Sequence, residues 1–173
     1  MATKFNLFFV PHFNERKRIS PLRLKICKLV HSNQALQNPV HVSLISSGFN
    51  ARDYAAFENE LRGFCRHEKP FAIKAEGFTS VLPDRFWTGI HISRTEKLAR
   101  FQKKLQDLRN KHATKKEKHI FRPPHITLAF PAKVDGLKKF KNPVVSMEFD
   151  RITVVKKEEE LGPYRIVKHV KIG

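Results

Sequence analysis

The sequence has few cysteines and no long apolar run. Its two cysteines, Cys27 and Cys65, form no Cys-x-x-Cys pair, so a structural zinc site is not expected. Both fall at apolar positions of predicted helices, which favours reduced thiols in the core. Near the N-terminus, the apolar residues 7–10 are too few for a secretory leader, and no stretch approaches the length of a membrane span. We therefore expect a soluble, cytoplasmic protein.

Acidic residues are also scarce. The 173-residue chain has 16 Asp and Glu against 34 Lys and Arg, so its formal net charge is +18. Such an excess indicates a polyanionic partner, most simply a nucleic acid or a nucleotide; an anionic membrane surface, or a basic surface kept for solubility, is the alternative. The length, with 40% hydrophobic residues and fifteen Phe, suits one domain over residues 1–173.

Two short motifs stand out against this background. Residues 124–129 read Pro-His-Ile-Thr-Leu-Ala, and residues 40–45 read Val-His-Val-Ser-Leu-Ile. Side chains alternate between the two faces of a β-strand. His125 therefore shares a face with Thr127, and His41 shares one with Ser43, while the apolar residues point the other way. Two such strands in one small domain predict a two-histidine site.

Periodicity and turn residues predict the elements around these motifs. Ser20 and Pro21 have the residue types of a helix N-cap and first turn, after a basic loop over 11–19. The expected strands are 5–10, 40–46, 70–77, 86–93, 125–130, 144–155 and 164–172, and the expected helices are 20–36, 51–67 and 94–111.

The order strand, helix, histidine strand occurs twice, over 5–46 and again over 86–130. Two similar lobes related by a pseudo-twofold axis would bring His41 and His125 face to face. The fold predicted from this pattern is α+β, with mainly antiparallel sheets and helices outside.

Two facing histidines are suited to acid–base catalysis. Imidazole titrates near ~6.5, so at neutral pH one ring can be neutral while the other is protonated, as a general base and a general acid require. The hydroxyls of Ser43 and Thr127 are suited to donate to phosphate oxygens in the transition state. This set of groups fits in-line attack of water on a phosphodiester, with no metal or cofactor.

A histidine and a hydroxyl two residues apart on a strand are common, and residues 91–93 (His-Ile-Ser) are a third example. We interpret this triplet as a strand end with a surface or cleft-edge histidine. The prediction of catalysis depends on two matching copies at equivalent places, together with the net charge. Phe49 and Phe130 follow the two motifs and are candidates for base stacking, but core packing is the favoured role for both, as it is for Trp87.

The paired motifs resemble the two signature motifs of the 2H phosphoesterase superfamily, and within it those of the LigT-like RNA 2′,3′-cyclic phosphodiesterases, also called 2′-5′ RNA ligases. The resemblance covers nearly the whole chain, because Lys-Pro-Phe from 69, Phe-Trp-Thr-Gly from 86 and Phe-Arg-Pro-Pro-His from 121 follow the order of that family. It implies a bilobal fold with a concave cleft between two antiparallel sheets. It also implies metal-independent action on 2′,3′-cyclic phosphate or 2′-5′-linked RNA ends.

The resemblance further implies roles for individual residues. His41 would be the proton donor to the leaving 3′ oxygen and His125 the proton acceptor from water, which gives a 2′-phosphate product. Ser43, in place of the commoner Thr, and Thr127 would hold the phosphate. Arg122, three positions before His125, is placed either to donate to the phosphate as a bidentate partner or to remain a solvated loop charge.

We therefore expect a monomeric hydrolase of RNA 2′,3′-cyclic phosphodiesters. The first alternative keeps the site but changes the substrate to 2′-5′-linked RNA or oligoadenylate, with ligation as the reverse reaction. The second alternative is a non-catalytic RNA-binding module whose basic surface binds the RNA and for which the two histidines do not matter.

Overall fold

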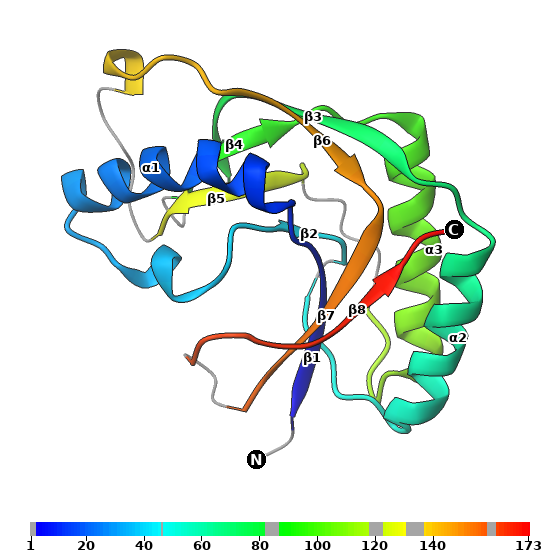
Figure 1. Ribbon diagram of the computed structural model, residues 1–173. Helices are drawn as coiled ribbons and strands as arrows, with labels where there is room; N and C mark the ends of the chain where they lie inside the picture. The colour runs from blue at the N-terminus through cyan, green and yellow to red at the C-terminus, as the bar shows by residue number, and fades with distance from the viewer. Residues whose placement is uncertain (1–2, 46, 82–86, 118–122, 131–136, 159–161) are drawn as a thin grey trace.

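The strands that the structure describes form one curled, antiparallel sheet (Figure 1). The computed structural model describes residues 3–45, 47–81, 87–117, 123–130, 137–158 and 162–173. Within these ranges the strands are β1 (Lys4–Phe9), β2 (Val42–Ser43), β3 (Phe71–Val81), β4 (Trp87–Ile92), β5 (His125–Ala129), β6 (Val144–Phe149), β7 (Arg151–Lys157) and β8 (Arg165–Lys171). Their order across the sheet is β6-β3-β4-β5-β2-β1-β7-β8, and every neighbouring pair is antiparallel.

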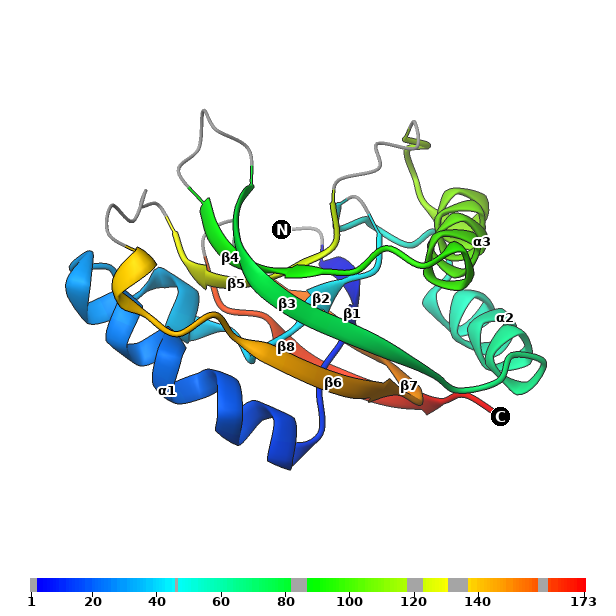
Figure 2. The same ribbon diagram turned by 90° about the horizontal axis from the view of Figure 1, so that it is seen from above.

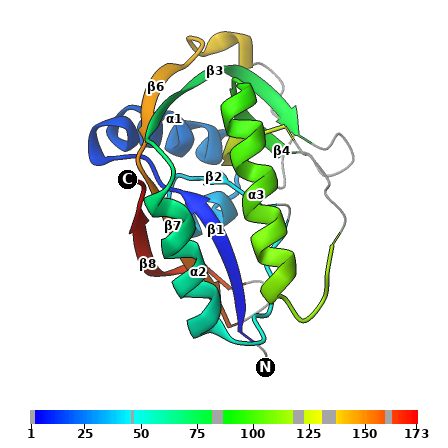
Figure 3. The same ribbon diagram turned by 90° about the vertical axis from the view of Figure 1, so that its right-hand side faces the viewer.

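The helices of the described residues pack at two opposite sides of the molecule (Figure 2). They are α1 (Phe13–Leu29), α2 (Tyr54–Arg66) and α3 (Glu96–His112), with short 3₁₀ turns η1 (Gln34–Gln37) and η3 (Leu137–Lys139). α1 packs against β5 and β6, whereas α2 and α3 lie side by side (Figure 3). None of these helices has the length and apolar character needed to cross a membrane.

Helices α2 and α3 each begin at a side-chain cap. The Asp53 carboxylate accepts a hydrogen bond from the backbone N–H of Ala56 at 3.0 Å, and Thr95 Oγ1 accepts one from Leu98 at 3.1 Å. Asp and Thr are preferred at this position because they satisfy N–H groups that have no partner inside the helix. The buried side chains of α2 then recur every four residues, at Phe57, Leu61 and Cys65. Both helices are confirmed, within three residues of the predicted ends.

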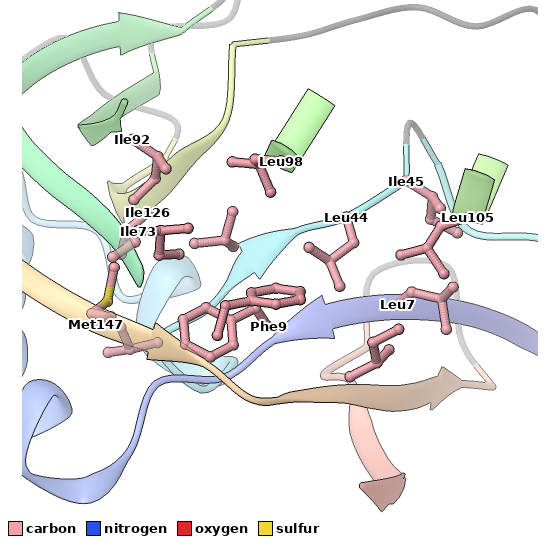
Figure 4. Packing of buried hydrophobic residues seen from close by; sticks show 14 of the residues in the cluster. Leu7, Phe9, Leu44, Ile45, Ile73, Ile92, Leu98, Leu105, Ile126 and Met147 are labelled. Atoms are coloured by element: carbon pink, nitrogen blue, oxygen red, sulfur yellow. The ribbon is translucent and has the colours of Figure 1, made fainter. Parts of the chain in front are cut away.

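The core lies between the sheet and the helices. Figure 4 shows apolar side chains from β1, β3, β5, β6 and α3 meeting there, among them the fully buried Leu7 and Phe9 of β1. Both cysteines, Cys27 and Cys65, are free and buried, as predicted. Burial raises the pKa of the Cys65 thiol to about 12, so this sulfur is unreactive at neutral pH.

Helix α1 begins earlier than predicted. It starts at Phe13 instead of near Ser20, so that Pro21 lies inside it. A proline in a helix leaves the carbonyl four residues before it without a donor, and here both Pro21 and Lys17 are on the exposed side. Water can therefore satisfy that carbonyl. The periodicity of the sequence predicts a buried stripe of Leu22, Ile26, Leu29 and Val30. The observed stripe has a different phase and consists of Ile19, Arg23, Ile26 and Cys27.

The prediction of two separate antiparallel sheets is wrong, because the described strands belong to one sheet. Its two four-stranded halves join where β2 meets β5, through the paired residues Val42 and Ile126. The predicted strand over 144–155 is in fact two strands that part at Asp150, with β6 at the edge of one half and β7 inside the other. The chain thus passes between the two halves here, as it also does between β2 and β3.

Candidate active site

A pocket lies across the junction of β2 and β5. Its volume is about 340 Å³, and its wall includes the side chains of His41, Ser43, His125 and Thr127. The alternate residues of both strands are fully buried in the core. The predicted alternation of faces is therefore confirmed, and the structure brings the two histidines and two hydroxyls to one pocket of a size suited to a small ligand.

The two imidazoles are anchored in the same way. Nδ1 of His41 lies 2.8 Å from the carbonyl oxygen of Pro39, and Nδ1 of His125 lies 2.9 Å from that of Pro123. A carbonyl oxygen only accepts, so Nδ1 carries the proton and donates in both rings. Nε2 is then the nitrogen that loses or gains a proton when either ring titrates.

The ring of His41 packs against an aromatic side chain. It stacks on Phe8 of β1, with ring centroids 3.8 Å apart and planes 15° from parallel. Tyr164 packs edge-on against Phe8, with ring centroids 5.0 Å apart. All three residues line the pocket, so the stack forms one wall of the site and limits the rotation of the His41 ring.

This environment lowers the pKa of His41 to about 4. Burial is the largest cause, because it disfavours the charged ring, and the hydrogen bond to the backbone opposes it. The positive charges of Arg23 and His125 lower the pKa further. His41 is therefore neutral at pH 7 in the unliganded protein.

The other end of the pocket also carries aromatic side chains. Trp87 packs edge-on against His125 with ring centroids 6.0 Å apart, and against Phe130 at 4.6 Å. Core packing was the predicted role of Trp87 and Phe130, and this prediction is wrong, because both line the pocket and are only partly buried. Phe49 does lie in the core, with 2% of its surface exposed.

Other elements add polar side chains to the pocket that the sequence reasoning missed. Arg23 comes from α1, Asn38 from the segment before β2, and Gln102 and Gln106 from α3. Gln102 Nε2 lies 3.4 Å from the backbone oxygen of Ser43, so it braces β2. Arg23 and Gln106 each occupy a buried position on an otherwise largely apolar helix face. For Arg23 the helix predicted over 20–36 does not indicate this position.

Two further predicted residues have other outcomes. Arg122 lies outside the described residues. His91 of the third triplet pairs with His125 across β4 and β5, but it is not among the residues that line the pocket. In the described part of the chain, no three His, Cys, Asp or Glu side chains are grouped as ligands for a metal.

Comparison with known proteins agrees with this fold. An antiparallel sheet that presents two histidine–hydroxyl pairs to one pocket has the features of the 2H phosphoesterases. The chain belongs to the 2′-5′ RNA ligase superfamily, whose family model matches residues 10–160. This confirms the resemblance inferred from the two motifs. No curated protein matches the chain.

Several solved structures share the fold over nearly their whole length. E. coli LigT complexed with 3′-AMP has a TM-score of 0.72 and 15% identity, with 99% of each chain covered. A protein described only as a phosphoesterase has a TM-score of 0.68 and 16% identity, with 99% of each chain covered. The protein TT0787 of Thermus thermophilus has a TM-score of 0.65 and 17% identity, with 98% of this chain and 97% of that chain covered. LigT has also been solved with phosphate and with ATP.

Proposed function

We propose that this protein hydrolyses RNA 2′,3′-cyclic phosphodiesters to 2′-phosphate ends, with His41 as general acid and His125 as general base. The observation that carries the proposal is the matched pair of imidazoles. Both rings line one pocket, and both donate through Nδ1 to a backbone carbonyl two residues earlier. Such fixed orientation is what proton transfer by a positioned side chain requires. Membership of a family of phosphoesterases and RNA ligases supports the same class of reaction.

The proposed reaction uses the side chains of the pocket alone. Nε2 of His125 takes a proton from water as the water oxygen attacks phosphorus, the bond from phosphorus to the 3′ oxygen breaks, and Nε2 of His41 gives its proton to that oxygen. The phosphate stays on the 2′ oxygen. Ser43 and Thr127 would donate hydrogen bonds to the non-bridging oxygens, where charge develops.

The acid role of His41 requires a proton that the ring lacks in the free protein at pH 7. Its pKa of about 4 reflects burial and two nearby positive charges. A phosphate anion bound in the pocket brings an opposite charge to the ring and raises its pKa. We therefore expect His41 to take up a proton when the substrate binds.

A second candidate function is cleavage, or reverse ligation, of 2′-5′-linked RNA or oligoadenylate. The pocket has aromatic rings at both ends, with Phe8 and Tyr164 at the His41 end and the pair Trp87 and Phe130 at the His125 end. A linear linkage has a base on each side of its phosphorus, and aromatic side chains bind bases by stacking. E. coli LigT has been solved with a nucleotide, 3′-AMP.

We also propose that the chain is one 2H phosphoesterase domain built by an internal duplication. The strand order supports this proposal, because β5 and β2 are neighbours at the centre and are flanked by β4 and β1 in turn. These are the strands that precede each histidine strand in the two sequence repeats.

A turnover assay with EDTA present tests the proposed function. A nucleoside 2′,3′-cyclic phosphate and 2′-5′-linked triadenylate are each offered to the wild type, His41→Ala and His125→Ala. We expect the cyclic phosphate to give a 2′-phosphate, at a rate that falls by about 100-fold or more in either variant. His91→Ala changes the third triplet, outside the pocket, and as the matched control it keeps most of the activity.

The other outcomes separate the candidates. Cleavage of the triadenylate alone would select the second candidate. A 3′-phosphate product would reject the assigned leaving oxygen. Turnover of neither substrate, with RNA binding equal in the wild type and both histidine variants, would refute the enzymatic proposals and favour an RNA-binding module.

A further inference from the structure

Helix α1 has a charged residue in its buried stripe. Arg23 lies between Ile19 and Ile26 on this face, with only 5% of its surface exposed. Arginine is almost never fully buried unless its charge is paired, since removal of a charge from water carries a large desolvation penalty. The guanidinium of Arg23 therefore needs a partner.

The protein supplies only part of that partner. Nη2 of Arg23 donates to the carbonyl oxygen of Asn38 at 3.0 Å, while the Nε N–H is buried and has no hydrogen-bond acceptor in the described part of the chain. Among the described residues, Arg23 forms no ion pair with an Asp or a Glu. Its positive charge is therefore met by one neutral carbonyl.

The second buried arginine of the described chain shows the usual solution. Arg109 of α3 is 2% exposed, and its Nη2 lies 3.2 Å from Glu117 Oε1. Its Nη1 donates to the backbone oxygen of Lys115 at 2.9 Å and to the side chain of Asn110 at 2.7 Å. The fold thus pairs Arg109 with a carboxylate. Arg23 has no such carboxylate among the described residues, which indicates that its anionic partner comes from a ligand.

The location of Arg23 indicates what the missing partner is. Arg23 lines the same pocket as His41, and its charge acts on that ring. An unpaired guanidinium in the wall of a ligand pocket is a binding group for an anion, and its planar fork matches the oxygens of a phosphate.

We propose that Arg23 is an anion-binding residue of this pocket and that its guanidinium takes a phosphate oxygen of the ligand at the His41 end. The inference rests on the proposed function for the nature of the ligand, but it requires only that the pocket bind phosphate. The ligand then supplies the negative charge that Glu117 supplies to Arg109.

Binding of inorganic phosphate tests the inference without any turnover. Calorimetric titration compares the wild type with Arg23→Met, which keeps much of the volume and removes the charge. We expect the dissociation constant to rise by about 10- to 100-fold, as for loss of hydrogen bonds to a charged group. Lys25→Met removes one charge from the exposed side of the same helix, and as the control it changes the constant by less than about 2-fold.

A second readout separates binding from a merely structural role. If Arg23 only held the carbonyl of Asn38 in place, Arg23→Met would lower the melting temperature and leave the phosphate affinity unchanged. NMR titration of the His41 ring gives the electrostatic test. Removal of the Arg23 charge should raise the pKa of His41 in the absence of phosphate, whereas Lys25→Met should not.

Several results would overturn the inference. Wild-type affinity for phosphate in a folded Arg23→Met would do so, as would the absence of measurable phosphate binding by the wild type. If Arg23→Met does not fold, Arg23→Lys decides, because a single ammonium group cannot present the two-pronged fork and should weaken binding several-fold. Phosphate binding that depends on Arg23, in a protein that cleaves neither candidate substrate, would uphold the inference and refute the proposed function.

Discussion

Val42 of β2 and Ile126 of β5 are direct partners, and their pairing joins the two halves of the sheet. Both side chains are fully buried. A slip of one residue would turn these apolar groups into the pocket and the polar groups into the core, so burial fixes the register. Continuing the antiparallel register by one residue places His41 opposite Thr127. Each imidazole thus faces the hydroxyl of the other motif.

The same register places Ser43 opposite His125, so the two hydroxyls have equivalent positions. We expect Ser43→Ala and Thr127→Val each to lower kcat/KM for the cyclic phosphate by about 10- to 100-fold, since each loses one hydrogen bond to a charged phosphate. Steady-state kinetics measures both, with Ser20→Ala on the exposed side of α1 as the control. A large loss in one variant and none in the other would contradict the equivalence.

Gly89 of β4 leaves no room for a side chain beside the site. A Cβ at this position would lie 2.8 Å from the carbonyl oxygen of Ile126 and 3.4 Å from Cδ2 of His125. Gly89→Ala must therefore push β5 and the His125 ring away. We expect the free energy of unfolding to fall by about 1–3 kcal/mol and the turnover rate to fall with it.

Gly63→Ala is the matched control for this substitution. Gly63 lies in α2, and a Cβ there would have nothing within 4 Å. Alanine is the better helix former, so this variant should gain about 0.5–1 kcal/mol and keep its activity. Urea unfolding and kinetics on both variants make the comparison. Wild-type stability and activity in Gly89→Ala would contradict the close approach of β4 and β5.

The low pKa of His41 links stability to pH. The pKa is about 4 in the folded protein and near ~6.5 in an unfolded chain. Between these values the unfolded chain binds more protons, so the free energy of unfolding falls as the pH drops from 6.5 to 4. This one group accounts for a loss of up to about 3 kcal/mol, fully present at pH 4 and absent above pH 6.5.

Urea unfolding of the wild type and His41→Gln at several pH values isolates this contribution. The comparison is needed because burial and the charges of Arg151 and Arg16 lower the pKa of His169 as well. We expect the wild type to lose more stability than the variant between pH 6.5 and 4. Parallel curves for the two proteins would show that the His41 ring titrates normally.

The faces of the two histidine strands could be predicted from the sequence, whereas the pairing of the strands could not. Alternation with period two is a local property, so residues 41–44 and 125–128 determine which side chains point together. Hydrogen bonding between strands is not local. The pairing of Val42 with Ile126 joins the two halves into one sheet. Neither motif contains a signal that indicates which strand it pairs with.

Competing local signals explain why Arg23 was missed. Ser20 and Pro21 have the residue types of a helix start, and a stripe that begins at Leu22 places Arg23 on the exposed side. In the structure the proline is tolerated on the solvent face, and burial of Ile19 and Ile26 sets the phase of the helix instead. That phase turns Arg23 toward the core. The sequence would indicate this orientation only if the helix were known to begin at Phe13.

Glu58 ties α2 to β8, the edge strand of the sheet. Its Oε1 accepts from Nζ of Lys168 and from Nη2 of Arg62, at 2.5 Å each. These two hydrogen bonds, first the one from Lys168, lower the pKa of Glu58 to about 2 although burial opposes the shift. A carboxylate with a lowered pKa stabilises the fold at pH values above its ordinary pKa of 4.5, and this contribution is lost as the pH falls through about 2.

Glu58→Gln should therefore lower the free energy of unfolding at pH 7 by about 1–2 kcal/mol, a figure reduced for the screening of a partly exposed pair. The gap in the free energy of unfolding between the wild type and the variant should narrow below pH 4.5 and close only below about pH 2, where the Glu58 carboxylate is protonated in the folded protein as well. Urea unfolding at pH 7, 4 and 2.5 measures this difference in the free energy of unfolding. Glu148→Gln on the exposed side of β6 serves as the control. A gap that is independent of pH would mean that Glu58 acts through packing and not through its charge.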